Sequence, residues 1–291
     1  KELLSQNIEM LLKQTMTVDS IIIVDNCSSD GTYEYLKNCG WTTEPFLYLK
    51  TETNIGGAGG FYTGVKAAYE AGADWIVLMD DDGRMADEHT MEILYRAARK
   101  LYDENRGERK LFVNALVQKG ELLSFKIDHM YTVVEAMMAA KNGLIEGAAN
   151  PFNGTMISRE LVSEIGYPNK DFFIKGDEVD FKQRALDVGA YVVTVVEARY
   201  IHPMPKTQER KVLGIRVPFL VEDPWKEYYA ARNFTYMYKK KGLYKAIVFE
   251  LIFVKILAVF SMQCRKIETI KMVLKGVCDG WKEKLGPTVT P

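Results

Sequence analysis

Residues 75–83 read WIVLMDDDG, five apolar residues followed directly by three carboxylates. A short, continuous apolar run is typical of a β-strand that is buried on both faces of a parallel sheet. Ionised carboxylates do not belong in such a core, so the strand must end at the rim of the sheet. This stretch therefore predicts a layered sheet with a polar edge.

Strand-like and helix-like runs alternate along the chain. The strand-like runs are apolar or β-branched and occupy residues 21–25, 46–50, 75–79, 111–117 and 191–202. The helix-like runs occupy residues 3–14, 32–40 and 64–73, and the region between 117 and 191 is polar and irregular. This alternation predicts an α/β fold with right-handed crossovers. We expect one domain over residues 1–217 and a helical region over residues 218–291.

Charge and cysteine content exclude several classes of protein. A net charge of -1 over 291 residues argues against nucleic acid as a partner, because phosphate backbones require an excess of Lys and Arg. The four cysteines show no zinc-type spacing, which indicates unpaired thiols in a reducing compartment. Because no secretory signal opens the chain, we expect a cytoplasmic protein.

The carboxylates Asp80, Asp81 and Asp82 suggest a metal site. In an extended chain Asp80 and Asp82 point to the same side and can share one cation. The cation removes the repulsion between them, and oxygen ligands suit Mg or Mn. The alternative is that these residues cap a helix that begins near Asp87, or solvate a turn. An EF-hand calcium loop does not fit, because the three Asp residues are contiguous.

Two further clusters and one histidine each have both a structural and a functional interpretation. The glycines of NIGGAGGFYTG (residues 54–64) either form a flexible turn or let backbone N–H groups approach an anion. Asp177 and Glu178 begin a predicted amphipathic helix, where they either cap its N-terminus or serve as a general base. His202 follows a predicted strand, where it is either a solvated surface residue or an additional metal ligand.

Several segments taken in order resemble one enzyme family. They are IIIVDNCSSDGT, NIGGAGGFYTGVKAAYEAGADWIVLMDDDG, FNGTMISRELVSEIGYP, FFIKGDEVDF and YIH. Together they are similar to the inverting family 2 glycosyltransferases, and within these to the bacterial rhamnosyltransferases and galactofuranosyltransferases. The resemblance implies a GT-A fold, that is, a mixed α/β sheet flanked by helices, here with a C-terminal helical extension.

The resemblance also implies a role for each candidate residue. The donor-binding residues it implies are Asp25, Asn54, Gly56, Gly57, Asp80 and Asp81. The metal ligands it implies are Asp80, Asp82 and His202, with Asp82 the preferred direct ligand. The base is one of the pair Asp177 and Glu178. The family motif commonly ends in Asp, whereas Glu stands second here, and alignment favours Glu178.

The implied reaction is a single displacement with inversion at the anomeric carbon. The donor is a UDP- or dTDP-linked sugar of the rhamnose or galactofuranose type, and Mn or Mg is the cofactor. The acceptor is a saccharide or lipid-linked saccharide of a growing cell-surface polysaccharide. Two other classes stay open, namely a nucleotidyltransferase, which releases pyrophosphate, and a non-catalytic homologue that only binds nucleotide sugars.

The two ends of the chain carry expectations of their own. The apolar run at residues 246–262 contains Glu250 and Lys255 and is too short to span a membrane with ease. It predicts either an interfacial helix at the inner face of the membrane or a helix buried against the domain or a partner chain, including a second copy.

Family members begin with a strand ending in a TYNR-like motif, which is missing here. We therefore expect the natural chain to continue upstream of Lys1, and we expect the strand at residues 21–24 to lack a neighbour.

Overall fold

The computed structural model describes residues 1–104, 110–212, 215–220, 222–246 and 266–289. The chain divides into two compact units. The first unit comprises Lys1–Asn54, Phe61–Pro168 and Phe181–Met204, and the second comprises Ile55–Gly60, Asn169–Asp180 and Pro205–Pro291. The second unit therefore draws two short internal segments out of the region expected to form the catalytic domain.

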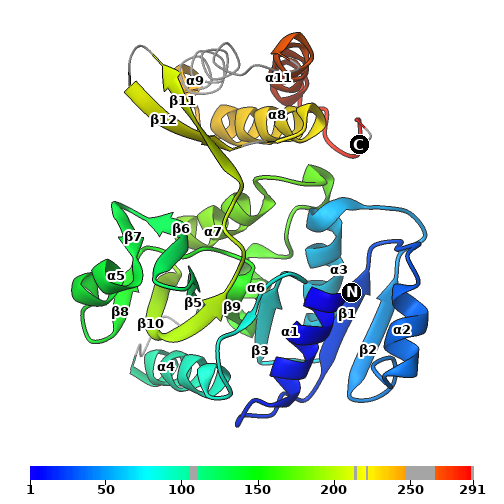
Figure 1. The fold of residues 1–291 in the computed structure, drawn as a ribbon, viewed down its shortest axis with the longest axis vertical. Helices are drawn as coiled ribbons and strands as arrows, with labels where there is room; N and C mark the ends of the chain where they lie inside the picture. Colours follow the sequence, from blue (N-terminus) through cyan, green and yellow to red (C-terminus); the bar gives the residue numbers. More distant parts are fainter. Residues whose placement is uncertain (105–109, 213–214, 221, 247–265, 290–291) are drawn as a thin grey trace. The chain divides into compact units, whose positions relative to one another are not determined.

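An eight-stranded mixed sheet is the centre of the first unit (Figure 1). Its main strand order is β3-β9-β5-β10-β4, with β6, β7 and β8 attached at the side. The strands are β3 (Trp75–Met79), β4 (Arg84–Met85), β5 (Leu111–Lys119), β6 (Leu122–Ile127), β7 (Met130–Thr132), β8 (Leu144–Glu146), β9 (Asn153–Ser158) and β10 (Tyr191–Ile201). The strands predicted from residues 75–79, 111–117 and 191–202 are confirmed.

Helices pack on both faces of this sheet. One core cluster joins the sheet to helices α3 (Gly56–Glu70), α6 (Arg159–Ile165) and α7 (Asp177–Asp187). A second core cluster joins the opposite side chains of the same strands to helix α4 (Thr90–Glu104). A smaller cluster packs β6 and helix α5 (Val133–Ala139) together. The expected layered α/β architecture follows from these three apolar contacts.

Strand β3 differs from its prediction in one respect. Its partner is β9, and the two strands run antiparallel, with Trp75 opposite Ser158. The apolar run correctly indicates burial on two faces, since Ile76 and Leu78 join one core cluster while Val77 packs against the other. The expectation of a parallel neighbour was wrong, because burial on both faces produces the same apolar pattern whichever way the adjacent strand runs.

The middle of the chain is regular rather than irregular. It contains strands β6 to β9, helices α5 and α6, and a short 3-10 helix η1 (Lys170–Phe172). Strand β9 escaped prediction because its sequence NGTMIS is polar, although all six residues are buried. The Thr155 Oγ1 hydroxyl of this strand donates to Asn114 Oδ1 over 2.6 Å, so these two buried polar groups satisfy each other.

Strands β1 (Ile21–Asp25) and β2 (Phe46–Lys50) form a separate parallel pair. Helices α1 (Glu2–Leu12) and α2 (Thr32–Asn38) cover it through a core of Ile8, Ile23, Leu36 and Phe46. The expectation that β1 lacks a neighbour was wrong, because Ile21 pairs with Phe46 and the register continues to the end of both strands. Among the described residues no ladder joins β1 to β3.

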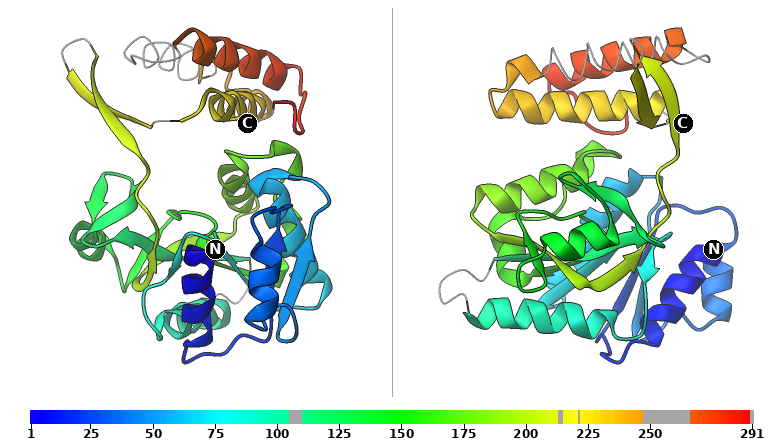
Figure 2. Two further views of the ribbon diagram at one scale, coloured as in Figure 1. Left: turned by 45° about the vertical axis from the view of Figure 1, so that its right-hand side comes forward. Right: turned by 60° about the vertical axis from the view of Figure 1, so that its left-hand side comes forward.

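The second unit is built around two helices. Helix α8 (Pro224–Lys240) lies beside α11 (Lys266–Trp281) in both views of Figure 2. A β-carbon on Gly280 would lie 2.2 Å from the Arg232 carbonyl oxygen, so the glycine is what permits this close approach. A hairpin of β11 (Thr207–Val212) and β12 (Ile215–Leu220) and the short α9 (Tyr244–Ala246) complete the unit.

The predicted apolar helix at residues 246–262 lies outside the described residues except for Ala246. Among the residues that the structure does describe, no helix combines the length and apolar character needed to cross a membrane. Cys27, Cys39 and Cys278 are free, exposed thiols.

The glycine-rich run is helical from Gly56 onward, so the flexible-turn interpretation was wrong. Gly56 itself has a φ of +73°, and a β-carbon there would lie 2.0 Å from the Phe173 carbonyl oxygen. Close backbone packing within the second unit therefore requires this glycine. A β-carbon on Gly57, by contrast, would meet nothing within 4 Å.

We expect Gly56→Ala to destabilise the protein by about 2 kcal/mol or more, because it adds a clash to an unfavourable backbone conformation. Gly57→Ala should leave stability unchanged or raise it by less than about 1 kcal/mol, since alanine favours a helix. Urea denaturation of the two variants beside the wild type measures both effects. Equal stability of the two variants would contradict the packing described for Gly56.

Candidate active site

The short strand β4 determines how the candidate site is assembled. After β3 the chain turns through Asp80–Gly83 and enters β4, which pairs antiparallel with the end of β10, Met85 opposite Tyr200. Because His202 directly follows β10, this pairing places it beside the turn that carries the three Asp residues. Residues separated by 120 positions in the sequence therefore meet at one edge of the sheet.

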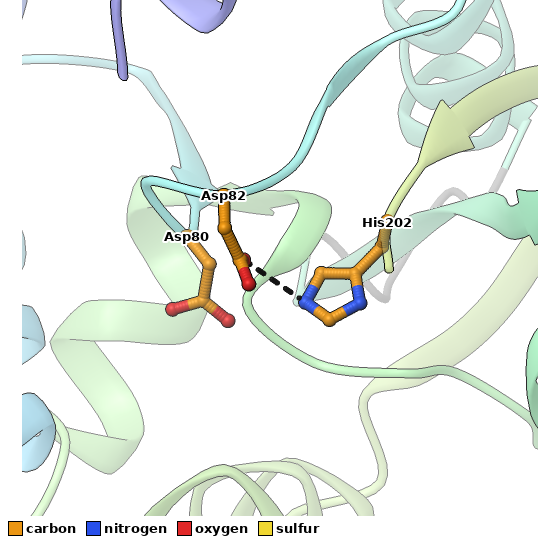
Figure 3. A group of neighbouring side chains, drawn as sticks. All are labelled: Asp80, Asp82 and His202. Carbon is orange, nitrogen blue, oxygen red and sulfur yellow. Dashed lines mark ion pairs between the residues drawn. The ribbon is translucent and has the colours of Figure 1, made fainter. Parts of the chain in front are cut away.

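Asp80, Asp82 and His202 point toward one another (Figure 3). Each offers one ligand atom, and these atoms all lie within 4.8 Å of one another. The His202 Nε2 atom lies 3.2 Å from Asp82 Oδ1. Asp81, between the two converging carboxylates, is exposed. The structure thus brings together the three residues that the sequence suggested as metal ligands.

The turn that carries these carboxylates is held by residues that the sequence did not suggest. Asn7 Nδ2 donates to the Asp80 carbonyl oxygen over 3.1 Å, and the fully buried Tyr200 lies against the same turn. A β-carbon on Gly83 would come within 2.3 Å of the Tyr200 ring, so only glycine fits there. The only feature of the sequence that could have pointed to Tyr200 is its position two residues before the candidate ligand His202.

The capping alternative for the three Asp residues is contradicted. Helix α4 begins at Thr90, and the side chain that accepts hydrogen bonds just before it is that of Asp87, from the His89 N–H over 2.9 Å and from Thr90 Oγ1 over 3.1 Å. Strand β4 separates Asp80–Asp82 from that helix. Capping the next helix therefore does not account for the carboxylate cluster.

The orientation of His202 tests whether a cation fits this cluster. Its Nδ1 lies 2.7 Å from the Pro203 carbonyl oxygen, which can only accept, so Nδ1 carries a hydrogen. In the neutral ring Nε2 then carries no hydrogen, and its lone pair faces the Asp82 carboxylate. Two acceptors at that distance repel each other unless a proton or a cation lies between them. The donor set, two carboxylates and one imidazole nitrogen, fits a divalent cation.

The protonation equilibria of the cluster reflect the same crowding. The hydrogen bond with His202, followed by its charge, lowers the pKa of Asp82 despite partial burial. Burial acts to lower the pKa of His202, but the hydrogen bond and charge of Asp82 outweigh it and raise that pKa. Desolvation by neighbouring atoms and the charge of Asp82 raise the pKa of Asp81, even though its side chain is exposed. Without a cation, a proton on His202 takes the position between the two groups.

Asp25 has a clear structural role. It is 4% exposed, accepts hydrogen bonds from the Ser28 N–H over 2.7 Å and from the Tyr48 hydroxyl, and these contacts outweigh burial to lower its pKa. Close by, Asn26 Nδ2 donates to Asn54 Oδ1 over 3.0 Å. The ends of β1 and β2 are thereby joined through polar side chains. A contact of Asp25 or Asn54 with a nucleoside remains a prediction.

Asp177 and Glu178 belong to the second unit and begin α7, as predicted. Glu178 Oε2 accepts from the Gly176 N–H over 2.9 Å, which confirms the helix-capping interpretation for this residue. Asp177 is only 6% exposed, whereas Glu178 is half-buried. A capping carboxylate keeps free lone pairs, so this contact is compatible with a role as base.

Comparison with known proteins places the chain. The family model described as glycosyl transferase family 2 matches residues 1–107. Over these residues the chain is similar to this family. It is 29% identical over 255 residues to the galactofuranosyltransferase GlfT1 of Mycolicibacterium smegmatis, an alignment covering 85% of this chain and 82% of the relative. It is 24% identical to the dTDP-rhamnosyl transferase RfbF of Shigella flexneri, covering 75% and 72%.

Solved structures confirm the predicted fold. The chain matches GalNAc-T7 with a TM-score of 0.56 at 13% identity, covering 94% of this chain and 52% of that one. It matches the mannosyltransferase PcManGT of Pyrobaculum calidifontis with a TM-score of 0.52 at 12% identity, covering 95% and 70%. The fold is GT-A, with a mixed sheet flanked by helices. At these identities the likeness concerns the fold alone.

The Asp25–Tyr48 hydrogen bond predicts a pH-dependent loss of stability. Because folding lowers the Asp25 pKa below its ordinary value of 3.8, the stabilisation is present above about pH 4 and is lost as pH falls through the folded-state pKa. We expect Tyr48→Phe to cost about 1.5–3 kcal/mol at pH 7 and less at pH 3. Urea denaturation at both pH values measures the difference.

Tyr33→Phe is the matched control, because the Tyr33 ring lies beside Tyr48, with 5.2 Å between their centroids, and is itself exposed. It should change stability little at either pH. A Tyr48→Phe effect that is the same at pH 3 and pH 7 would show that the hydroxyl does not act through the Asp25 charge.

Proposed function

We propose that this chain is a metal-dependent, inverting glycosyltransferase. It transfers a galactofuranose- or rhamnose-type sugar from a UDP- or dTDP-linked donor to a hydroxyl group of a saccharide or lipid-linked saccharide. The observation that carries the proposal is the convergence of Asp80, Asp82 and His202 at the end of β3 and β10. The match of residues 1–107 to the glycosyl transferase family 2 model supports the reaction class.

The relatives narrow the choice of donor sugar. Similarity to the galactofuranosyltransferase extends over 85% of the chain at 29% identity, compared with 75% at 24% identity for the dTDP-rhamnosyl transferase. Both alignments extend beyond residues 1–107, which the family model matches. A galactofuranose-type donor is therefore the first to test, and a rhamnose-type donor is the second.

The cofactor we propose is a divalent cation held by Asp80, Asp82 and His202. Its chemical contribution is to stabilise the negative charge of the departing nucleoside diphosphate. The chain itself orients the ligands, since the Pro203 carbonyl fixes the His202 ring and Asn7 holds the Asp80 turn. Of the two metals, Mn suits the imidazole ligand better, because Mg takes oxygen ligands almost exclusively. The structure of GalNAc-T7 contains UDP and Mn2+, and that of PcManGT contains GDP-Man and Mn2+.

The base we propose is Glu178. It accepts the proton of the acceptor hydroxyl as the new glycosidic bond forms. Its partial exposure supports this assignment over Asp177, which is 6% exposed and therefore less accessible to an incoming saccharide. Its hydrogen bond with the Gly176 N–H fixes the direction of the carboxylate.

Nucleoside diphosphate release tests the metal-site proposal. With Mn and a panel of UDP- and dTDP-sugars, one donor should release its diphosphate in the presence of a saccharide or lipid-linked acceptor. We expect Asp82→Asn to reduce this release at least about 100-fold, because it removes an anionic metal ligand. Asp87→Asn is the control, since the asparagine side-chain oxygen can also accept from the His89 N–H and the Thr90 hydroxyl, and the rate should stay near wild type.

The other outcomes of this experiment separate the remaining function classes. Release that is indifferent to chelation and to Asp82→Asn would contradict the metal site. Donor binding without turnover across a broad acceptor panel would indicate a non-catalytic homologue. Release of pyrophosphate from a nucleoside triphosphate would indicate a nucleotidyltransferase.

Glu178→Gln tests the base separately from the metal site. We expect kcat to fall by about 10²–10⁴, because proton acceptance in the transition state is lost. The affinity for the donor and Mn should not change. Asp177→Asn is the matched variant and should have the smaller effect on kcat. The opposite ranking of the two variants would assign the base to Asp177.

A further inference from the structure

A strained loop precedes the two acidic residues of the second unit. In this loop, residues 171–176, Phe173 has a φ of 65°, Lys175 of 69° and Gly176 of 87°. Residues other than glycine avoid this left-handed conformation, so the surrounding structure must hold Phe173 and Lys175 in place. The loop leads directly into Asp177 and Glu178 at the start of α7.

Asn233 on α8 contacts three carbonyl groups of this loop. Its Nδ2 atom lies 3.0 Å from the Phe172 oxygen, 3.0 Å from the Ile174 oxygen and 2.6 Å from the Lys175 oxygen. The side chain is fully buried, so water does not compete for its two amide hydrogens. A single side chain thus spans both sides of the strained residues.

Arg232 sets the orientation of that amide group. Its Nε donates to Asn233 Oδ1 over 2.8 Å, which turns the amide nitrogen toward the loop. Its Nη2 donates to the Asp171 oxygen over 3.0 Å and to the Phe172 oxygen over 2.9 Å. Burial lowers the pKa of the fully enclosed Arg232, so this cation is costly to desolvate. An apolar residue could fill the same volume but could not hold the loop.

The Phe173 carbonyl group of the loop accepts a hydrogen bond from helix α3 instead of α8. The Ala58 N–H, in the first turn of α3, donates to the Phe173 oxygen over 3.0 Å. Every carbonyl from Asp171 to Lys175 therefore accepts a hydrogen bond from outside the loop. The donors Arg232 and Asn233 lie on helix α8, which packs closely against α11. Gly276 and Gly280 allow α11 to contact the α8 backbone directly.

We propose that Arg232 and Asn233 are positioning residues for the base. They act on the reaction through the loop at residues 171–176, which sets the place and direction of the Glu178 carboxylate. This inference rests on the proposed function, in which Glu178 accepts the proton of the acceptor. Small displacements of a base lower the rate steeply, so the rigidity of the loop has a direct catalytic consequence.

Asn233→Asp is the sharpest test, because it keeps the shape of the side chain and replaces the amide donor with an acceptor. We expect kcat to fall about tenfold or more while the donor KM and Mn affinity remain unchanged. Backbone amide hydrogen exchange at residues 173–178 should become faster. Arg232→Lys, which keeps the charge and loses the Nε donor, should have the same effects.

Tyr228→Phe is the control for general loss of stability. This substitution keeps the buried ring, which shares an apolar cluster with Phe173, and removes only the hydroxyl, which donates to Asp279 and contacts Thr288. Its removal should lower the melting temperature without a selective loss of kcat. A loss of kcat in Tyr228→Phe equal to that in Asn233→Asp would overturn the positioning role.

Combining Asn233→Asp with Glu178→Gln separates this inference from the proposed function. If Asn233 acts through Glu178, the second substitution should lower kcat little further, because the group it positions is already inactive. Losses that multiply would overturn the inference, as would a wild-type kcat in Asn233→Asp. A wild-type kcat in Glu178→Gln alone would instead refute the proposed base, whatever Asn233 does.

Discussion

The pairing of β4 with the end of β10 is the contact on which the candidate active site depends. It involves only two residue pairs, Tyr200 with Met85 and Ile201 with Arg84. Without it, the turn after β3 and the residue after β10 have no reason to meet. The fully buried Tyr200 reinforces this contact, because its ring fills the space beneath the Asp80–Gly83 turn. The two-residue strand β4 therefore brings the side chains of Asp80, Asp82 and His202 together at the edge of the sheet.

Electrostatics at this edge make the convergence chemically meaningful. Two carboxylates and an imidazole held this close require a positive charge among them. A proton on His202 can provide it, and a divalent cation provides it together with the ability to hold a diphosphate. In the second unit, hydrogen bonds rather than charges fix the position of a candidate catalytic residue. There, buried donors on α8 hold a strained loop whose next residues are the acidic pair at the start of α7.

The sequence predicted the elements with strong local signals and failed where the signal was tertiary. The strands at residues 21–25, 46–50 and 75–79 were predicted with the observed bounds, because each is a compact apolar run between turn residues. Strand β9 was not predicted, because its buried Asn153 and Thr155 read as a polar loop. The glycines after Asn54 read as a loop as well. They belong to helix α3, and the glycine at its first position leaves room for the Phe173 carbonyl oxygen.

In the candidate site, too, some features follow from local sequence and others only from tertiary contacts. The sequence by itself determined the layered α/β class, the carboxylates at the end of β3 and the acidic start of α7, because periodicity and strand ends are local properties. Only the tertiary structure decided that His202 lies 3.2 Å from Asp82 and that Arg232 and Asn233 hold a loop some 60 residues away in the chain. Contacts of this kind depend on strand pairing and helix packing between distant segments. No local pattern of residues encodes them.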